Sequence, residues 1–153
     1  MPYERTELGE FSSVVCLKAI ITGMEDILGI QATAISLTSA GRIRGKSVIQ
    51  QINNRSEINL DNFAERLNDI IGQEGTRLCI VDSIQVDGDA VIIHTRETVC
   101  SAGEQDGTDR KCTYTLGVVW GAIEEVLGKR YRGTHTDSVL RGSSHDVFRL
   151  EPR

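Results

Sequence analysis

Hydrophobic residues recur at two different periods along this chain, and the change of period divides it into predicted helices and strands. Near the start, apolar side chains are spaced by three and four residues, which is the spacing of one buried helix face. This predicts a first helix of about 20 residues that ends at Gly29. Residues 31–37 then alternate small and β-branched side chains, which predicts a short strand. The apolar helix positions are Val14, Leu17, Ile21, Met24 and Leu28.

The middle of the chain predicts two more helices and a hairpin. Thr38 or Ser39 can cap a helix from about Ala40 to Gln51, on which two glycines lie four residues apart. Another helix opens at Asn59 or Asp61 and ends at Gly72. Two Val/Ile-rich runs, 77–86 and 89–99, follow with an Asp-Gly pair between them, which is a strong hairpin signal.

The last third predicts a helix over 109–127, ended by Gly128, and then two strands around a Gly-Ser-Ser turn. Its helix buries Leu116, Val119 and Ile123 and also carries two glycines, Gly117 and Gly121. Either another helix or a ligand ring could pack on that glycine strip. The mixed order of helices and hairpins predicts an α+β fold, a mainly antiparallel sheet of about four to five strands packed against four helices.

Composition narrows the class of protein. A chain of 153 residues with 39% hydrophobic and 25% charged residues suits one domain, residues 1–153, with a real core. The net charge of −5 and the lack of a Lys/Arg stripe argue against nucleic-acid binding. No apolar run is long enough to span a membrane, and the polar Met1–Gly9 segment is not a signal peptide, so we expect a cytoplasmic protein. Four cysteines without a CxxC pair predict free thiols.

The segment from about Val86 to Leu150 resembles the 4-vinyl-reductase domain, a hydrocarbon-binding family. The resemblance rests on a cysteine, Cys112, a glycine-punctuated helix, and polar residues at fixed offsets after it. A weaker match covers Ala34 to Gly45, which includes Ala-Gly-Arg-Ile-Arg-Gly. The family's fold is shared with sensors of aromatic compounds and with small subunits of the TRAPP tethering complex. The resemblance implies binding of a hydrophobic small molecule, such as a hydrocarbon or a tetrapyrrole.

The same resemblance implies where a metal would lie. Metal-binding members hold zinc on a Cys, a Glu and two later Cys, and these positions carry Cys112, His135, Ser138 and Asp146 here. Only the first cysteine is retained, so the sequence predicts no structural zinc. Cys112, His135 and Asp146 remain the candidate ligands, because thiolate, imidazole and carboxylate all bind zinc or iron. Cys112 opens its helix, where it is either a reactive thiol or a small buried residue.

A ligand site is expected between the 112–127 helix, the N-terminal helix and the sheet. Each candidate also has an ordinary structural explanation. Trp120 could wall a pocket, join a dimer contact or fill the core. His94 could face a cavity or lie on a solvated strand face. Arg42 and Arg130 could pair with ligand carboxylates or with water. The candidate ligand-binding residues are Trp120, Tyr114, Ile123, His94, His135, Arg42 and Arg130.

These observations favour a non-catalytic binding module. The ligand would be apolar or aromatic, with a tetrapyrrole such as a chlorophyll intermediate or a bilin as the first one to test. No dinucleotide fingerprint, P-loop or nucleophile elbow occurs in the sequence. One alternative is a dimeric assembly factor or adaptor that acts through protein–protein contacts, for example in photosynthetic complexes, and a homodimer is expected in either case. The other alternative is an accessory protein of a vinyl reductase, which would need a cofactor from elsewhere.

Overall fold

The computed structural model describes Arg5, Glu7, Gly9, Phe11 and residues 13–153. Most of the Met1–Gly9 segment, which the sequence predicts not to be a signal peptide, therefore lies outside the described residues. Among the described residues, no helix is both long and apolar enough to cross a bilayer.

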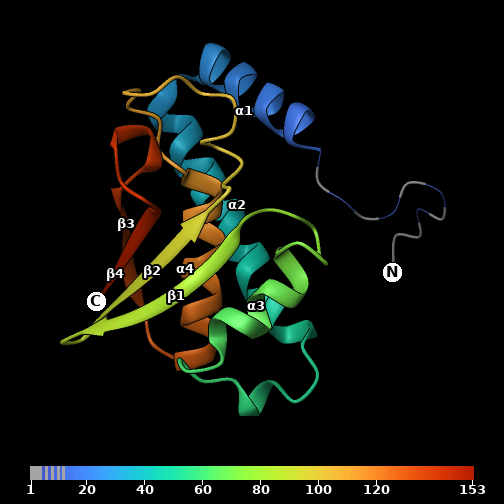
Figure 1. Cartoon of the computed structure of the whole chain (residues 1–153), viewed down its shortest axis with the longest axis vertical. Coiled ribbons are helices and arrows are strands. Elements are labelled where there is room, and N and C mark those ends of the chain that lie inside the picture. Colours follow the sequence, from blue (N-terminus) through green and yellow to red (C-terminus); the bar gives the residue numbers. More distant parts are fainter. Residues whose placement is uncertain (1–4, 6, 8, 10, 12) are drawn as a thin grey trace.

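The chain forms four helices and a four-stranded sheet, which confirms the predicted α+β class (Figure 1). The sheet order is β1-β2-β4-β3, and every neighbouring pair is antiparallel. The helices are α1 (Val14–Leu28), α2 (Ile30–Gln51), α3 (Phe63–Ile71) and α4 (Thr113–Leu127). The strands are β1 (Ile80–Asp87), β2 (Ala90–Arg96), β3 (Tyr131–Asp137) and β4 (Asp146–Pro152). Two short 3₁₀ turns are η1 (Arg55–Glu57) and η2 (Val139–Arg141). Helices α3 and α4 contact the sheet, α2 packs on α4, and α1 packs on α2.

Helix α4 is the central element of the molecule. Every residue from Thr115 to Glu124 is buried, so this helix is enclosed on all sides. Figure 1 shows it between α2 and the sheet. A helix with apolar residues all round is stable only in such a position.

Helices α2 and α4 touch backbone to backbone through four glycines. A Cβ added to Gly41 would lie 3.0 Å from the Cα of Gly117, and one added to Gly121 would lie 2.8 Å from the Cα of Arg42. Such contact requires that neither helix carries a side chain at these positions. The glycine strip on α4 therefore packs on another helix and not on a ligand.

The strand predicted for residues 31–37 is wrong, and so is the predicted helix cap at Thr38 or Ser39. Residues 30–51 form one continuous helix, α2. The deciding pattern is the longer one, because the buried residues of α2 recur at helical spacing over five turns while the β-like alternation covers only seven residues. These buried residues are Thr33, Leu37, Gly41, Gly45, Val48 and Ile49.

The other elements lie close to their predicted positions. The Asp87–Gly88 pair joins β1 to β2, and Gly88 has the positive φ of +60° that such a turn requires. Gly128 ends α4 in the left-handed conformation, with a φ of +63°. Helix α3 begins two to four residues later than predicted and buries Phe63, Leu67 and Ile71. Helix α4 begins at Thr113, four residues after the predicted start.

Candidate functional site

A buried polar cluster lies where the N-terminus of α4 meets the ends of β3 and β4. The backbone N–H of Cys112 donates to Nδ1 of His135 at 3.2 Å. Nε2 of the same ring lies 3.2 Å from Oδ1 of Asp146. Since Nδ1 accepts a hydrogen bond, the ring proton must be on Nε2 and the imidazole is neutral. His135 therefore links the start of α4 to the start of β4.

Asp146 is a fully buried carboxylate held by hydrogen bonds. Its Oδ2 accepts from the hydroxyls of Thr98 and Ser101, both at 2.7 Å. Burial raises the pKa of Asp146, but the hydrogen bonds from His135, Ser101, Thr98 and Ser138 outweigh that effect. The net result is a pKa well below the ordinary value of an aspartate. The cluster thus fixes the turn after β2, the start of α4 and the start of β4 against one another.

Cys112 is bonded to Cys100 in a disulfide, with their Cα atoms 5.2 Å apart. The prediction of free thiols is therefore wrong for these two residues. The pair is 12 residues apart without a CxxC pattern, so only the folded chain brings the sulfurs together. Cys16, which is exposed, and Cys79, which is buried, are free, and burial followed by the negative charge of Asp146 raises the pKa of Cys79 to about 12.

The three candidate metal ligands do come together, since donor atoms of Cys112, His135 and Asp146 lie within 4.8 Å of one another. In the disulfide form they nevertheless do not fit a metal ion. The sulfur of Cys112 is bonded to the sulfur of Cys100, so it is not available as a metal ligand. Both ring nitrogens of His135 already have hydrogen-bond partners in the protein. Ser138 is the N-cap residue of η2, and its hydroxyl accepts a hydrogen bond from the backbone N–H of Leu140.

A second buried carboxylate, Glu124, engages two of the predicted ligand-binding residues. The indole N–H of Trp120 and the backbone N–H of Tyr131 both donate to Oε1 of Glu124 at 3.0 Å. Arg42 donates to Oε2 at 2.8 Å and lies 4.4 Å from the centre of the Trp120 ring. Burial raises the pKa of Glu124, and the hydrogen bonds from Tyr131, Arg42 and Trp120 more than reverse this. Glu124 therefore joins α4 to β3 through Tyr131 and to α2 through Arg42, and its bond to Trp120 lies within α4.

The sequence reasoning missed Glu124 as a buried residue. A signal was available, because Glu124 follows Trp120 by four residues on the same helix, and that spacing lets the two side chains meet. An acidic residue in an otherwise apolar helix needs a partner when it is buried.

The remaining predicted ligand-binding residues lie in separate places. Ile123 is a core residue, and Arg130 lies in the exposed turn before β3. His94 is on the sheet face opposite α4, where its ring makes an edge contact with His145 at 5.6 Å. Tyr114 is half-buried at the start of α4, and burial raises the pKa of its hydroxyl. The predicted residues thus do not form one site.

An apolar void does lie between α1 and α4, next to Tyr114. It is small, about 10 Å³, which is close to the space for one water molecule. Residues 101–111, a segment without helix or strand, run beside it. The void is lined by Leu17, Ile21, Val99, Cys100, Lys111, Thr113, Tyr114 and Thr115.

Ion pairs hold the 101–111 segment to α1. Arg110 binds Glu25 at 2.8 Å and Glu104 at 2.6 Å, and Lys18 binds Glu104. Beside these pairs lies a more open hollow of about 400 Å³ with a largely apolar wall. It reaches from Ile30 and Ala34 on α2 to Thr113 at the start of α4.

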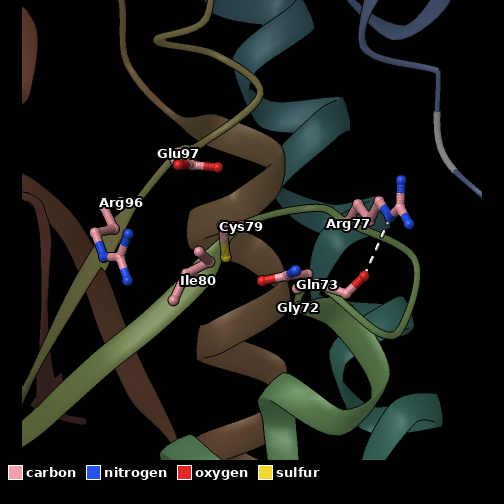
Figure 2. Close-up of a pocket in the computed structure, with 7 residues that line it drawn as sticks. All are labelled: Gly72, Gln73, Arg77, Cys79, Ile80, Arg96 and Glu97. Carbon is pink, nitrogen blue, oxygen red and sulfur yellow. Dashed lines mark hydrogen bonds between the residues drawn. The ribbon is translucent and has the colours of Figure 1, made fainter.

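A further hollow of about 380 Å³ lies at the C-terminal end of α3, lined by Gly72, Gln73, Arg77, Cys79, Ile80, Arg96 and Glu97. Figure 2 shows the side chains of Arg77 and Arg96 on opposite sides of it. Both guanidinium groups have protein partners, because Arg77 donates to the carbonyl of Gln73 and Arg96 pairs with Asp82 at 2.7 Å. The hollow is therefore a weaker candidate for an anion site than its two arginines suggest.

Solved structures of other proteins share this fold. One is the phenol-responsive sensory domain of the transcription activator PoxR with phenol, which has a TM-score of 0.72 and 13% sequence identity over 93% of this chain and 75% of that one. Another is a trafficking protein particle complex subunit 3 from Naegleria fowleri covalently bound to palmitic acid, with a TM-score of 0.62 and 17% identity over 92% of each chain. No protein-family model and no curated protein matches the sequence.

At such low identity these two structures establish the fold alone. The resemblance to the 4-vinyl-reductase domain implied the fold of aromatic-compound sensors and TRAPP subunits. The likeness to these two structures confirms that fold. Membership of the 4-vinyl-reductase family itself stays a prediction from the sequence.

Proposed function

We propose that this domain binds a small apolar molecule with one aromatic ring, between α1 and α4 and beneath residues 101–111, without catalysing a reaction on it. The observation that carries this proposal is the apolar void lined by Leu17, Ile21, Val99 and Tyr114. A similar fold serves as a phenol-responsive sensory domain, which supports the same chemical class of ligand here.

The void must open before it can hold such a ligand. A benzene-sized molecule needs an apolar cavity of about 150 Å³, whereas the void measures about 10 Å³. Helix α1 is the element able to move, because Ile21 is its only buried residue. Burial of one isoleucine stabilises by about 1.5–3 kcal/mol, and each partly exposed ion pair adds at most about 1 kcal/mol. Ligand binding of ordinary strength can offset that cost.

A tetrapyrrole, the ligand that the sequence suggested first, gains no support from the described residues. Its four rings need far more room than the void offers. Arg42, which was expected to bind a ligand carboxylate, is already paired with Glu124. We therefore propose a single-ring ligand and use phenol as the probe.

Phenol is expected to bind the wild-type protein and to shift the NMR signals of Leu17, Ile21, Val99 and Tyr114. Replacing Leu17 with tryptophan should fill the void and weaken binding by about tenfold, which corresponds to about 1.4 kcal/mol. The measurement is a methyl and aromatic NMR titration with phenol up to about 10 mM, which detects millimolar dissociation constants.

Ile20→Trp is the matched control, because Ile20 lies on the same helix but is 55% exposed. It should bind phenol as the wild type does. Shifts confined to the sheet, or a titration without any shift at these four residues, would contradict the proposed site. Circular dichroism of both variants shows whether the fold is intact.

A second candidate function, assembly through a homodimer, is favoured by the apolar surface of α1 and α2. Eight of the ten exposed large hydrophobic side chains among the described residues lie on these two helices. Monomers rarely leave so many in one region, and a second copy of the chain carries the same apolar surface to cover it. They are Val14, Val15, Ile20, Ile27, Leu28, Ile30, Ile35 and Ile43.

The double variant Ile27→Glu/Ile35→Glu is expected to shift the protein from dimer to monomer, because each glutamate places a charge in the interface core. The measurement is sedimentation velocity over a range of concentrations. Val86→Glu is the control, since Val86 is about as exposed as Ile35, at 61% against 63%, but lies on β1. A wild type that stays monomeric at every concentration rules out this candidate.

A further inference from the structure

The Cys100–Cys112 disulfide closes the 101–111 segment into a loop beside the apolar void. Cys112 is the N-cap residue of α4, and Cys100 is the last residue before the segment. Cys100 also lines the void, next to Val99. The bond therefore joins the wall of the void directly to the central helix.

The other attachments of this segment are polar. Besides its ion pairs to α1, the carbonyl oxygens of Thr108 and Arg110 accept hydrogen bonds from Arg141 at 3.0 and 3.3 Å. The segment carries five charged residues and has Gly103 and Gly107 at positive φ. Partly exposed polar contacts of this kind break and re-form readily. Ser101 is also held by its hydrogen bond to the buried carboxylate of Asp146, so the disulfide is the strongest constraint on the segment beyond Ser101.

We propose that the Cys100–Cys112 disulfide is a reversible redox lock: when it is reduced, the 101–111 segment separates from α4 and the void opens to ligand. The part that concerns the ligand rests on the function proposed above. The lock itself rests only on the disulfide and its neighbours, and it places a thiol pair where the resemblance implied a metal ion.

The surroundings of the two sulfurs indicate how reduction proceeds. A thiolate of a dithiol reductant attacks Sγ of Cys100, the S–S bond breaks, and Cys112 leaves with the bonding electron pair. Cys100 is the sulfur attacked because it is the more exposed of the two residues, at 5% against 1% for Cys112, and Cys112 lies at a helix N-terminus, which favours it as the leaving group. The second thiol of the reductant then releases Cys100. The protein gains two electrons and two protons, and the reductant becomes a disulfide.

Reduction leaves two separate thiols that form no link between Cys100 and α4. Thr98 and Ser101 stay bonded to Asp146, so residues 98–101 keep their place. The part of the segment beyond Ser101 becomes free to move away from the void, which Lys111 lines.

Amide hydrogen exchange of the full chain tests the lock without any ligand. Oxidised protein, prepared with glutathione disulfide, is compared with protein reduced by dithiothreitol, both in EDTA so that no metal replaces the disulfide. Reduction should speed exchange of the 101–111 amides by about 100-fold, as expected for opening a loop of this length, and leave β2 unchanged. Cys100→Ser should match the reduced protein, and the exposed Cys16→Ser should match the wild type.

Phenol titration of the same samples tests the opening of the void. Reduced protein should bind phenol about tenfold more tightly than oxidised protein, because a larger fraction of the reduced protein has the void open for ligand. Four free thiols after treatment with glutathione disulfide, or equal exchange in both forms, overturns the lock. Faster exchange with equal phenol affinity overturns its control of the void. Faster exchange without phenol binding in either form supports the lock and overturns the proposed ligand.

Discussion

Replacing Gly45 with alanine is expected to lower the free energy of unfolding by about 3 kcal/mol, because the added methyl group has no space. Its Cβ would lie 2.8 Å from the backbone nitrogen of Ala122 and would collide with the carbonyl oxygen of Val118. Backbone atoms of a buried helix cannot move aside as the end of a flexible side chain can. Helices α2 and α4 would have to separate, which would disturb the core around Val118.

Gly23→Ala is the matched control for this prediction. Gly23 is also inside a helix, but a Cβ there has no neighbour within 4 Å. Alanine should raise stability at this position by about 0.5–1 kcal/mol, because it is the better helix former. Urea denaturation followed by circular dichroism measures both variants. Equal effects of the two substitutions would mean that α2 and α4 are not in backbone contact.

Asp146→Asn is expected to destabilise the protein by about 3 kcal/mol at neutral pH, since an amide cannot replace the carboxylate among its donors. The amide NH₂ would face the hydroxyls of Thr98 and Ser101, which donate to the carboxylate in the wild type. The hydrogen bond from His135 would end on a neutral amide oxygen. The turn after β2 and the start of β4 would lose their common partner. Urea denaturation at pH 7 measures the loss.

The pH dependence of stability gives a second test of Asp146. Its pKa is lowered on folding, so its stabilising effect is complete above the unfolded value of about 3.9 and is lost as the pH falls towards the folded pKa. The wild type should therefore lose stability steeply below about pH 4, and Asp146→Asn should lose less over the same range. Asp137→Asn, at an exposed position on β3, should keep the wild-type slope.

The sequence predicted most of the fold because its signals were long or chemically specific. The spacing of Leu116, Val119 and Ile123 extends over several turns of α4, and Asp87–Gly88 marks a turn that few other residues can make. The strand predicted at 31–37 was wrong because that window held fewer residues than the helix around it. Only the backbone contact with α4 explains why α2 carries glycines at 41 and 45.

The site was harder to predict because its parts depend on contacts between distant residues. The sequence indicated Cys112, His135 and Asp146, and the structure brings them together. Thr98, Ser101 and Cys100 were not foreseen as their neighbours, since hydroxyls and single cysteines carry no periodic signal. Burial of Trp120 against Glu124 likewise depends on Arg42 and Tyr131, which come from other parts of the chain.

The direction of α1 depends on a single residue. Gly29 ends α1 and precedes α2 with a φ of +84° and a ψ of 159°, and no other residue separates the two helices. Side chains larger than hydrogen disfavour this conformation. With a helical φ at that position, residues 14–51 would form one straight rod. Leu17 and Ile21 would then point away from α4, and the chain would have no wall on that side of the void.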